Sequence, residues 1–313
     1  MSSIPLDHGG NLDSAAKHYG GKRQDWLDLS TGINPEAYSL NSVQEADWKA
    51  LPDKLANTEI CLAARKFWNV PDKADILAVP GCSSAIAQIP TLFSPGSVEI
   101  AVPTYNEHAA SFQFHGWKTL TKSKSPRARV IVHPNNPTGK FSELPDPAPL
   151  NIIDESFCDI APLRSHIARS AMPGHIILKS FGKFWGLAGL RLGFAIGDPF
   201  LIKALRQKLG PWPVSGIALR IGTKALQDYD WADNTRNRLK IDIARLDTLL
   251  MTLKAKPIGD CSLFRTYAVE DAAQIQKQFA ESLIWSRIFP YSNDWIRLGL
   301  PPKYDWSRLE NAL

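Results

Sequence analysis

The turn over residues 179–193 carries side chains whose types and spacing could do chemistry. Its sequence, Lys-Ser-Phe-Gly-Lys-Phe-Trp-Gly-Leu-Ala-Gly-Leu-Arg-Leu-Gly, lies between two short apolar runs that are typical of buried strands. Ser180, Lys183 and Arg191 are therefore expected on a loop that a rigid scaffold presents, which is where enzymes usually carry function. A lone lysine would indicate a basic surface turn, but the spacing of these three residues favours a functional site.

Three more short apolar runs bring polar residues to their C-terminal ends. The runs cover residues 98–102, 129–133 and 151–155, and the polar residues are Tyr105, Asn136 and Asp154. Short runs that are apolar on both faces and separated by helical stretches predict a mostly parallel sheet with helices on both sides. Because ligands bind beyond the carboxyl ends of such strands, we expect these three residues and Lys183 to share one site.

A possible phosphate site follows another apolar run. Residues 76–79 lead into Gly81-Cys82-Ser83-Ser84, and a helix-like apolar run over residues 85–93 comes next. Small residues at the start of a helix expose unpaired N–H groups, which bind phosphate readily. The alternative is a serine N-cap without a ligand.

Taken together, these motifs carry a family resemblance. The segments at 133–139, 154–157 and 180–193 resemble the fold type I aminotransferase superfamily, in particular its histidinol-phosphate aminotransferase branch. That superfamily uses pyridoxal 5′-phosphate (PLP). The resemblance covers residues 8–313 and implies an α/β protein of PLP-dependent transferase fold type I. Its large domain would have a mostly parallel mixed sheet flanked by helices, and a small α/β domain would follow at the C-terminus.

The resemblance assigns a role to each polar residue. Lys183 would hold the cofactor aldehyde as a Schiff base and then act as a base. Asp154 would keep the pyridine nitrogen protonated, Asn136 would hydrogen-bond the ring oxygen, and Tyr105 would stack on the ring. Lys183, Asp154 and Tyr105 are thus the expected catalytic residues. The residues expected at the cofactor phosphate are Gly81, Cys82, Ser83, Ser180 and Arg191.

Taken alone, two loops near the N-terminus could be either plain turns or ligand-binding loops. Residues 5–11 and 28–35 are plain turns by composition. Glycine nevertheless lets a backbone come close to a ligand, and His8, Asn11 and Asn34 could donate hydrogen bonds to an anion.

The same loops bear on the choice within the superfamily. His8-Gly9-Gly10-Asn11, residues 30–35 and residues 295–301 are similar to the threonine-phosphate decarboxylases of cobalamin biosynthesis. Those enzymes make (R)-1-amino-2-propanol phosphate from O-phospho-L-threonine and release carbon dioxide. The resemblance implies a phosphorylated amino acid as substrate. It places Arg297 with Asn34 at the substrate carboxylate, and His8, Gly9 and Arg287 near the substrate phosphate.

Two departures from the aminotransferase pattern affect the alternatives. Phe157 stands where many aminotransferases have a tyrosine that hydrogen-bonds the ring oxygen, which favours the decarboxylase. Leu51-Pro52-Asp53 stands where they usually place a tyrosine that reaches the partner subunit's cofactor, although a homodimer is still expected. The alternative is an aminotransferase acting on histidinol phosphate or an aromatic amino acid. A regulatory or binding protein without catalytic activity is disfavoured, because Lys183, Asp154, Asn136 and Arg191 are all present.

Composition excludes several other classes. The chain has 313 residues, 44% hydrophobic and 21% charged, with a net charge of +5. This fits a globular enzyme that handles anionic small molecules, and the scattered basic residues do not indicate nucleic-acid binding. The cluster from Lys118 to Arg129 is expected to be a solvated loop. No apolar run is long enough to span a membrane, and residues 1–5 do not resemble a secretory signal. Four widely spaced cysteines indicate reduced thiols in a cytoplasm rather than disulfides or a metal site.

The elements that position these residues suggest three segments. We expect an N-terminal arm over residues 1–30, a large PLP-binding domain over 31–235 and a small domain over 236–313. Leucine and isoleucine repeat at helical spacing between Leu239 and Leu253, which predicts a long helix joining the two domains. Beyond it, strand and helix patterns alternate to the C-terminus, with one strand expected over residues 285–289.

Overall fold

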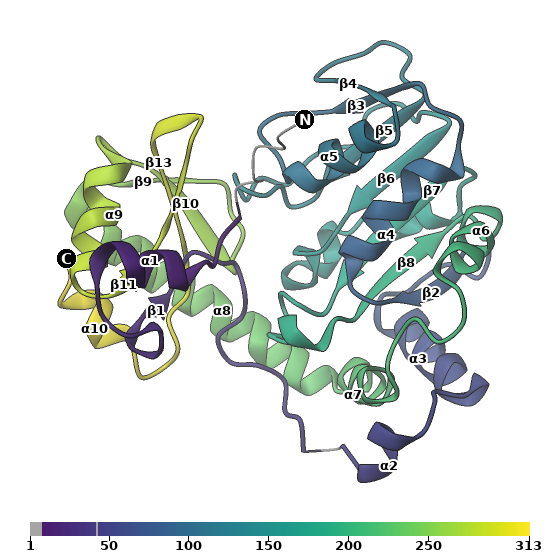
Figure 1. Ribbon diagram of the computed structural model, residues 1–313, viewed down its shortest axis with the longest axis horizontal. Helices are drawn as coiled ribbons and strands as arrows, with labels where there is room; N and C mark the ends of the chain where they lie inside the picture. The colour runs from purple at the N-terminus through teal and green to yellow at the C-terminus, as the bar shows by residue number, and fades with distance from the viewer. Residues whose placement is uncertain (1–7, 42) are drawn as a thin grey trace. The chain divides into compact units, whose positions relative to one another are not determined.

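The computed structural model describes residues 8–41 and 43–313. The chain divides into two compact units, which we describe separately (Figure 1). The central unit comprises Ala37–Asn136 and Phe141–Thr235. The terminal unit comprises the chain up to Glu36, Pro137–Lys140 and Arg236–Leu313. The N-terminal segment is thus grouped with the C-terminal one, and the division into an arm, a large domain and a small domain stays a prediction.

The central unit is built on a seven-stranded sheet. Its strands, in spatial order, are β2 (Asp75–Val79), β8 (Gly193–Gly197), β7 (His175–Ser180), β6 (Leu150–Asp154), β5 (Ala128–Val132), β3 (Ser97–Ile100) and β4 (Lys118–Leu120). β8 pairs antiparallel with both of its neighbours, and all other pairs are parallel. The expected mostly parallel mixed sheet is confirmed.

Some helices of the central unit begin at residues whose side chains cap them. The helices are α2 (Glu45–Lys49), α3 (Lys54–Phe67), α4 (Cys82–Gln88), α5 (Asn106–Phe114), α6 (Pro199–Leu209) and α7 (Gly216–Gln227). The Asp53 carboxylate accepts a hydrogen bond from the Ala56 N–H, and Ser215 caps α7 in the same way. Helices α4, α5 and α6 share one core cluster with the sheet, to which they contribute Ile86, Phe112 and Ile202 respectively.

The terminal unit contains two small sheets. Its elements are α1 (Leu12–Tyr19), β1 (Leu27–Asp28), β9 (Lys256–Ile258), β10 (Phe264–Ala268), α9 (Ala272–Glu281), β11 (Ile284–Trp285), β12 (Arg287–Phe289), β13 (Ser292–Gly299) and α10 (Trp306–Glu310). The order β12-β13-β10-β9 forms an antiparallel sheet, and β1 pairs in parallel with β11. The single strand expected over residues 285–289 is therefore wrong, because the chain changes sheets at Ser286.

The expected long helix is present as α8, which runs over Tyr229–Leu250; it begins ten residues before Leu239, and the Asp228 carboxylate accepts from the Trp231 N–H at that start. One other expectation needs correction. The basic cluster from Lys118 to Arg129 is a loop only in its middle, because its two ends form β4 and part of β5.

Short 3-10 helices complete the fold. They are η1 (Arg23–Asp25), η2 (Ile89–Leu92), η3 (Cys158–Ile160), η4 (Pro162–Arg164), η5 (Ile167–Ala171), η6 (Ala188–Leu190) and η7 (Met251–Leu253). Among the residues that the structure describes, no helix has both the length and the apolar character needed to cross a membrane.

Candidate active site

The central unit encloses a cavity of about 180 Å³ beside the C-terminal ends of its parallel strands. The sequence-predicted residues that line it are Cys82, Ser83, Tyr105, Asn136, Asp154, Ser180, Lys183 and Arg191. These residues come from loops and strand ends far apart in the chain. The structure therefore brings eight of the nine expected cofactor residues to one place, at the edge where a parallel sheet usually binds ligands.

Gly81, the ninth residue, lies directly beside the cavity wall. It precedes α4 with a φ of 76°, a conformation that side chains rarely adopt. A Cβ atom at this position would lie 2.4 Å from an Nη atom of Arg191. The absence of a side chain thus leaves room for the guanidinium, which donates a hydrogen bond to the Ser83 hydroxyl at 3.0 Å. Arginine, serine and backbone meet here in a cradle suited to a phosphate.

Asp154 is a buried carboxylate, 3% exposed, and it has two hydrogen-bond donors. His108 Nε2 lies 2.9 Å from its Oδ2, and the Ser156 N–H donates to its Oδ1 at 3.0 Å. Burial alone raises the pKa of Asp154, but the hydrogen bond and charge of His108, with Ser156, lower that pKa below its ordinary value. Asp154 is therefore held as an anion that can accept a hydrogen bond from a protonated ring nitrogen.

His108 was not predicted from the sequence. It lies on the first turn of α5, three residues after Tyr105, and only 1% of it is exposed. A histidine one helical turn beyond the expected stacking residue is a signal that could have been used. The contact with Asp154 depends on β6 and α5 meeting in space, which the local sequence does not show.

Aromatic rings form other walls of the cavity. The Lys183 Nζ lies 5.3 Å from the centre of the Phe157 ring. Burial, followed by the charge of Asp154, raises the pKa of Tyr105 to about 12, so its hydroxyl stays neutral at physiological pH. Tyr105 and Phe157 thus supply uncharged aromatic surface to the cavity wall.

This set of groups fits PLP. It contains one amine for an aldehyde, one ionised carboxylate for a ring nitrogen, aromatic surface for the ring, and a guanidinium with hydroxyls for a phosphate. The space that Gly81 leaves beside Arg191 is what a phosphate cradle needs.

The residues expected to bind substrate all belong to the terminal unit. Arg287 and Arg297 are paired residues on the antiparallel strands β12 and β13. Arg297 is 2% exposed, and its Nη2 donates to the Ser30 carbonyl at 2.6 Å. A Cβ on Gly9 would lie 2.4 Å from the same carbonyl oxygen and 3.3 Å from Arg297 Nη2. Two like charges on paired positions favour a bound anion.

The other two substrate candidates have different surroundings. His8 is exposed. Asn34 is 2% exposed, and its side-chain oxygen accepts from Arg238 at 2.5 Å and from the Glu36 N–H at 3.1 Å. Arg238, on α8, was not predicted from the sequence. The structure thus gathers Gly9 and Arg297 around Ser30, with Arg287 paired to Arg297, and it places Asn34 against a second guanidinium.

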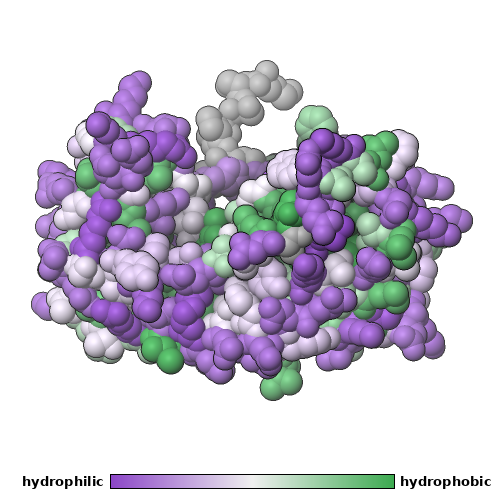
Figure 2. Space-filling model, turned by 90° about the horizontal axis from the view of Figure 1, so that it is seen from below, coloured by the Kyte–Doolittle hydropathy of each residue, from purple (hydrophilic) through white to green (hydrophobic). Residues whose placement is uncertain are grey.

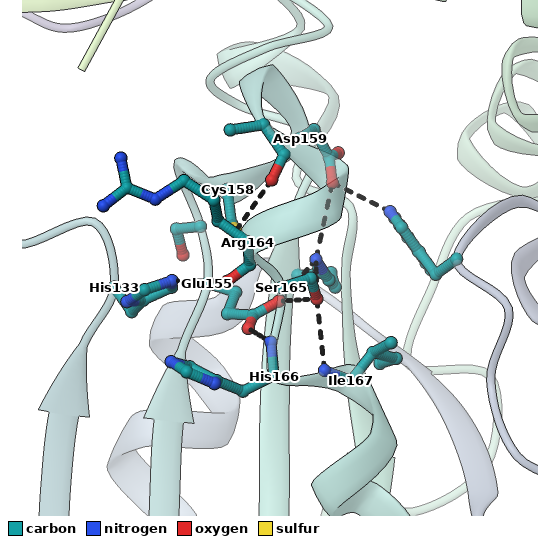
Figure 3. A network of polar contacts seen from close by, with 12 residues as sticks. His133, Glu155, Cys158, Asp159, Arg164, Ser165, His166 and Ile167 are labelled. Atoms are coloured by element: carbon teal, nitrogen blue, oxygen red, sulfur yellow. Dashed lines mark hydrogen bonds and ion pairs between the residues drawn. The ribbon is translucent and has the colours of Figure 1, made fainter. Parts of the chain in front are cut away.

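A second group of side chains of types that can bind metal ions includes Glu155, which directly follows Asp154. Ligand atoms of His133, Glu155 and Cys158 all lie within 4.8 Å of one another (Figure 3). His133 accepts from the Ser142 N–H through Nδ1, so its Nε2 carries the proton and donates to the Arg164 carbonyl. Glu155 is bound by the Ser165 hydroxyl and the His166 N–H. His133 and Glu155 therefore each take part in a network of hydrogen bonds with neighbouring residues.

Comparisons with known proteins identify the family. The model of the family described as aminotransferase class I and II matches residues 43–313. Curated relatives include a threonine-phosphate decarboxylase of Pseudomonas aeruginosa, 36% identical over 98% of this chain and 97% of that protein. Another threonine-phosphate decarboxylase, from a Sinorhizobium species, is 36% identical over 96% of this chain and 95% of its own length. The chain therefore belongs to the aminotransferase class I and II family.

Solved structures show the same fold. A histidinol-phosphate aminotransferase from Sinorhizobium meliloti, in complex with pyridoxal-5′-phosphate, matches with a TM-score of 0.85 at 17% identity. The match covers 99% of this chain and 94% of that chain. The fold type I architecture expected from the sequence is thus confirmed.

Proposed function

We propose that this protein is a PLP-dependent decarboxylase that converts O-phospho-L-threonine to (R)-1-amino-2-propanol phosphate in cobalamin biosynthesis. The observation that carries the proposal is the 36% identity to curated threonine-phosphate decarboxylases over nearly the whole of both chains. The cavity supports it, because its side chains can hold the cofactor that this chemistry requires.

The residues of the central unit hold the cofactor. Arg191, Ser83 and Ser180, with the backbone at Gly81 and Cys82, would bind its phosphate. Asp154, kept ionised by His108, would accept a hydrogen bond from the ring nitrogen, and Asn136 would donate to the ring oxygen. Tyr105 would cover one face of the ring, and Lys183 would supply the amine that holds the aldehyde. When bound, PLP supplies an electron sink for the bond at Cα that lies perpendicular to its ring.

The residues of the terminal unit hold the substrate. Arg297 and Asn34 would bind the carboxylate, and Arg287, His8 and Gly9 would bind the phosphate. Anchors at both anionic ends would orient the substrate so that the bond from Cα to the carboxylate is the one that breaks. The Lys183 amine, once the substrate amine has replaced it at the aldehyde, would hold the proton that Cα takes up as carbon dioxide leaves.

A paired assay on the PLP-loaded protein tests this function. One reaction contains O-phospho-L-threonine and is followed for carbon dioxide and aminopropanol phosphate. The other contains histidinol phosphate with 2-oxoglutarate and is followed for glutamate. We expect carbon dioxide without any need for a keto acid. Glutamate formation without carbon dioxide would instead identify an aminotransferase and overturn the proposal.

We also propose that the protein is a cytoplasmic homodimer. A groove of about 850 Å³ lies among α2, α3 and α7, and its apolar walls include Leu51, Leu55 and Leu62, which are 68%, 61% and 55% exposed. Figure 2 shows one face of the molecule, on which hydrophobic side chains interrupt a mainly hydrophilic surface. Exposed apolar side chains of this size on helices are typical of an interface. The free thiols of all four cysteines fit a reducing compartment.

Sedimentation tests the dimer. Replacing Leu55 and Leu62 together by Asp should convert the dimer to a monomer, since two charges would be buried in the interface. Phe200→Asp is the control, because Phe200 lies on α6 and is 77% exposed outside this groove. A wild-type protein that sediments as a monomer would refute the dimer.

A further inference from the structure

The ends of strands β6 and β7 carry charged side chains on both faces of the sheet. Asp154 and Ser180 line the cavity. Successive residues of a strand point to opposite faces, so their neighbours Glu155 and Lys179 point away from the cavity. Both are buried, with 0% and 1% exposed, and the Lys179 Nζ lies 2.6 Å from the Glu155 Oε2.

A second carboxylate completes this buried cluster. Asp159 lies on η3, and its Oδ1 is 3.6 Å from the Lys179 Nζ. Each of its oxygens accepts a hydrogen bond from an indole N–H, one from Trp68 at 2.8 Å and one from Trp185 at 3.2 Å. Figure 3 shows Asp159 beside Glu155 and Ser165 in the same network. The Ser165 hydroxyl donates to Glu155 Oε2 at 2.5 Å.

The cluster contacts the Lys183 turn from both sides. Lys179 precedes Lys183 by four residues, and Trp185 follows it by two. Two backbone hydrogen bonds close this turn, from the Phe181 N–H to the Leu192 carbonyl and from the Leu187 N–H to the Phe181 carbonyl. A displacement of Asp159 would therefore act on the chain both before Lys183, through Lys179, and after it, through Trp185.

The energetics of buried ions indicate what such a cluster contributes. Desolvation cancels most of the attraction in a buried ion pair, so apolar residues of similar size would be about as stable. Directional hydrogen bonds contribute specificity, which apolar packing does not, because they allow only one arrangement of the groups that they join. Removal of one partner, in contrast, leaves a buried charge uncompensated.

We infer that Asp159, together with Glu155 and Lys179, positions the Lys183 turn relative to Asp154 and Arg191. This inference rests on the proposed role of Lys183 as the cofactor lysine. Asp159 is a positioning residue: it acts through Lys179 and Trp185, and it does not line the cavity. The same two strands thus hold the cofactor groups on one face and the cluster that orients them on the other.

Two matched tryptophan variants test this inference. Trp185→Phe and Trp68→Phe each remove one indole donor from the same carboxylate, but only Trp185 lies on the lysine turn. The dissociation constant of PLP is measured by titrating the apoprotein and following its visible absorption band. The pH midpoint of that band and the thermal unfolding of the apoprotein are measured as well. We expect Trp185→Phe to weaken PLP binding about tenfold and to shift the pH midpoint, since small misplacements of reacting groups are costly.

The controls separate positioning from simple packing. Trp68→Phe should destabilise the apoprotein to a similar degree while changing PLP binding by less than about threefold. Trp231→Phe removes a ring that stacks on Trp185 at 5.1 Å without bonding Asp159, and it should also leave the pH midpoint unchanged. Equal effects of Trp185→Phe and Trp68→Phe on PLP binding would overturn the inference. If the wild-type protein failed to decarboxylate phosphothreonine, these binding measurements would still stand.

Discussion

Arg191 and Arg297 are both proposed to bind anions, but their surroundings differ. Arg191 is exposed, has a φ of 53°, and lies on a loop against Gly81 and Ser83. Arg297 is buried in the middle of β13, where Arg287 is its partner across the sheet. The first arginine belongs to a cradle that a bound phosphate can complete. The second is fixed by strand register before any substrate arrives.

This difference suggests that the two arginines control different steps. Variants at the cradle in the central unit should change cofactor binding. Variants in the terminal unit should change substrate use while leaving the cofactor in place. The following predictions test that separation, beginning with the largest expected effect.

Lys183→Ala should abolish the visible absorption band of the bound cofactor and reduce decarboxylation by at least about a thousandfold. The reason is that the variant lacks both the amine that bonds to the aldehyde and the proton donor. Absorption spectra of the PLP-loaded protein check the first effect directly. Lys203→Ala, an exposed position on α6, is the control. A retained band would mean that another lysine holds the cofactor.

Arg297→Gln should lower kcat/KM for phosphothreonine by about 10- to 100-fold, as expected for the loss of a charge-assisted hydrogen bond. The visible band and the dissociation constant of PLP should stay at their wild-type values. Steady-state kinetics and PLP titration on the same preparation measure both. If PLP binding fell in parallel with kcat/KM, the proposed separation of the two arginines would be wrong.

Gly81→Ala should weaken PLP binding by about tenfold. Its Cβ would lie 2.4 Å from a guanidinium nitrogen of Arg191, and its positive φ adds a backbone cost of about 1–2 kcal/mol. Gly116→Ala separates the two effects, because Gly116 has a φ of +78° and its Cβ would meet no atom closer than 3.9 Å. The control should lose stability but bind PLP normally. If both variants lost PLP binding equally, the proposed role of Gly81 in the phosphate cradle would be contradicted.

These variants also show what the sequence could and could not reveal. The cofactor residues stand in short motifs at strand ends, so local patterns sufficed to predict eight residues that share one cavity. His108 was missed because its contact with Asp154 joins a helix to a strand 46 residues away. Likewise, the pairing of Arg287 with Arg297 depends on the register of two strands. The change of sheet at Ser286 was missed because the sequence of residues 285–289 does not show which neighbour each strand pairs with.

The smallest effect is expected for His108→Phe, and it concerns pH. In the wild-type protein His108 and Ser156 lower the pKa of Asp154 below its ordinary value, although burial alone would raise it. The stability that the ionised carboxylate contributes is therefore present above its unfolded pKa and is lost as pH falls through the lower folded pKa. Without His108, burial dominates and the folded pKa rises, so that loss should begin at a higher pH.

Acid titration of the visible band and of the apoprotein's unfolding temperature measures this shift. Cofactor binding at pH 7 should change by less than about tenfold, which corresponds to a shift of about one pKa unit. His115→Phe is the control. His115 directly follows α5, and its ring hydrogen-bonds the Ala87 carbonyl instead of Asp154. An acid midpoint that does not move in His108→Phe would show that Ser156 alone holds Asp154 ionised. The charge of Asp154 would then depend on a residue two positions along the chain, whereas the Gly81 cradle depends on a contact with Arg191 made across the fold.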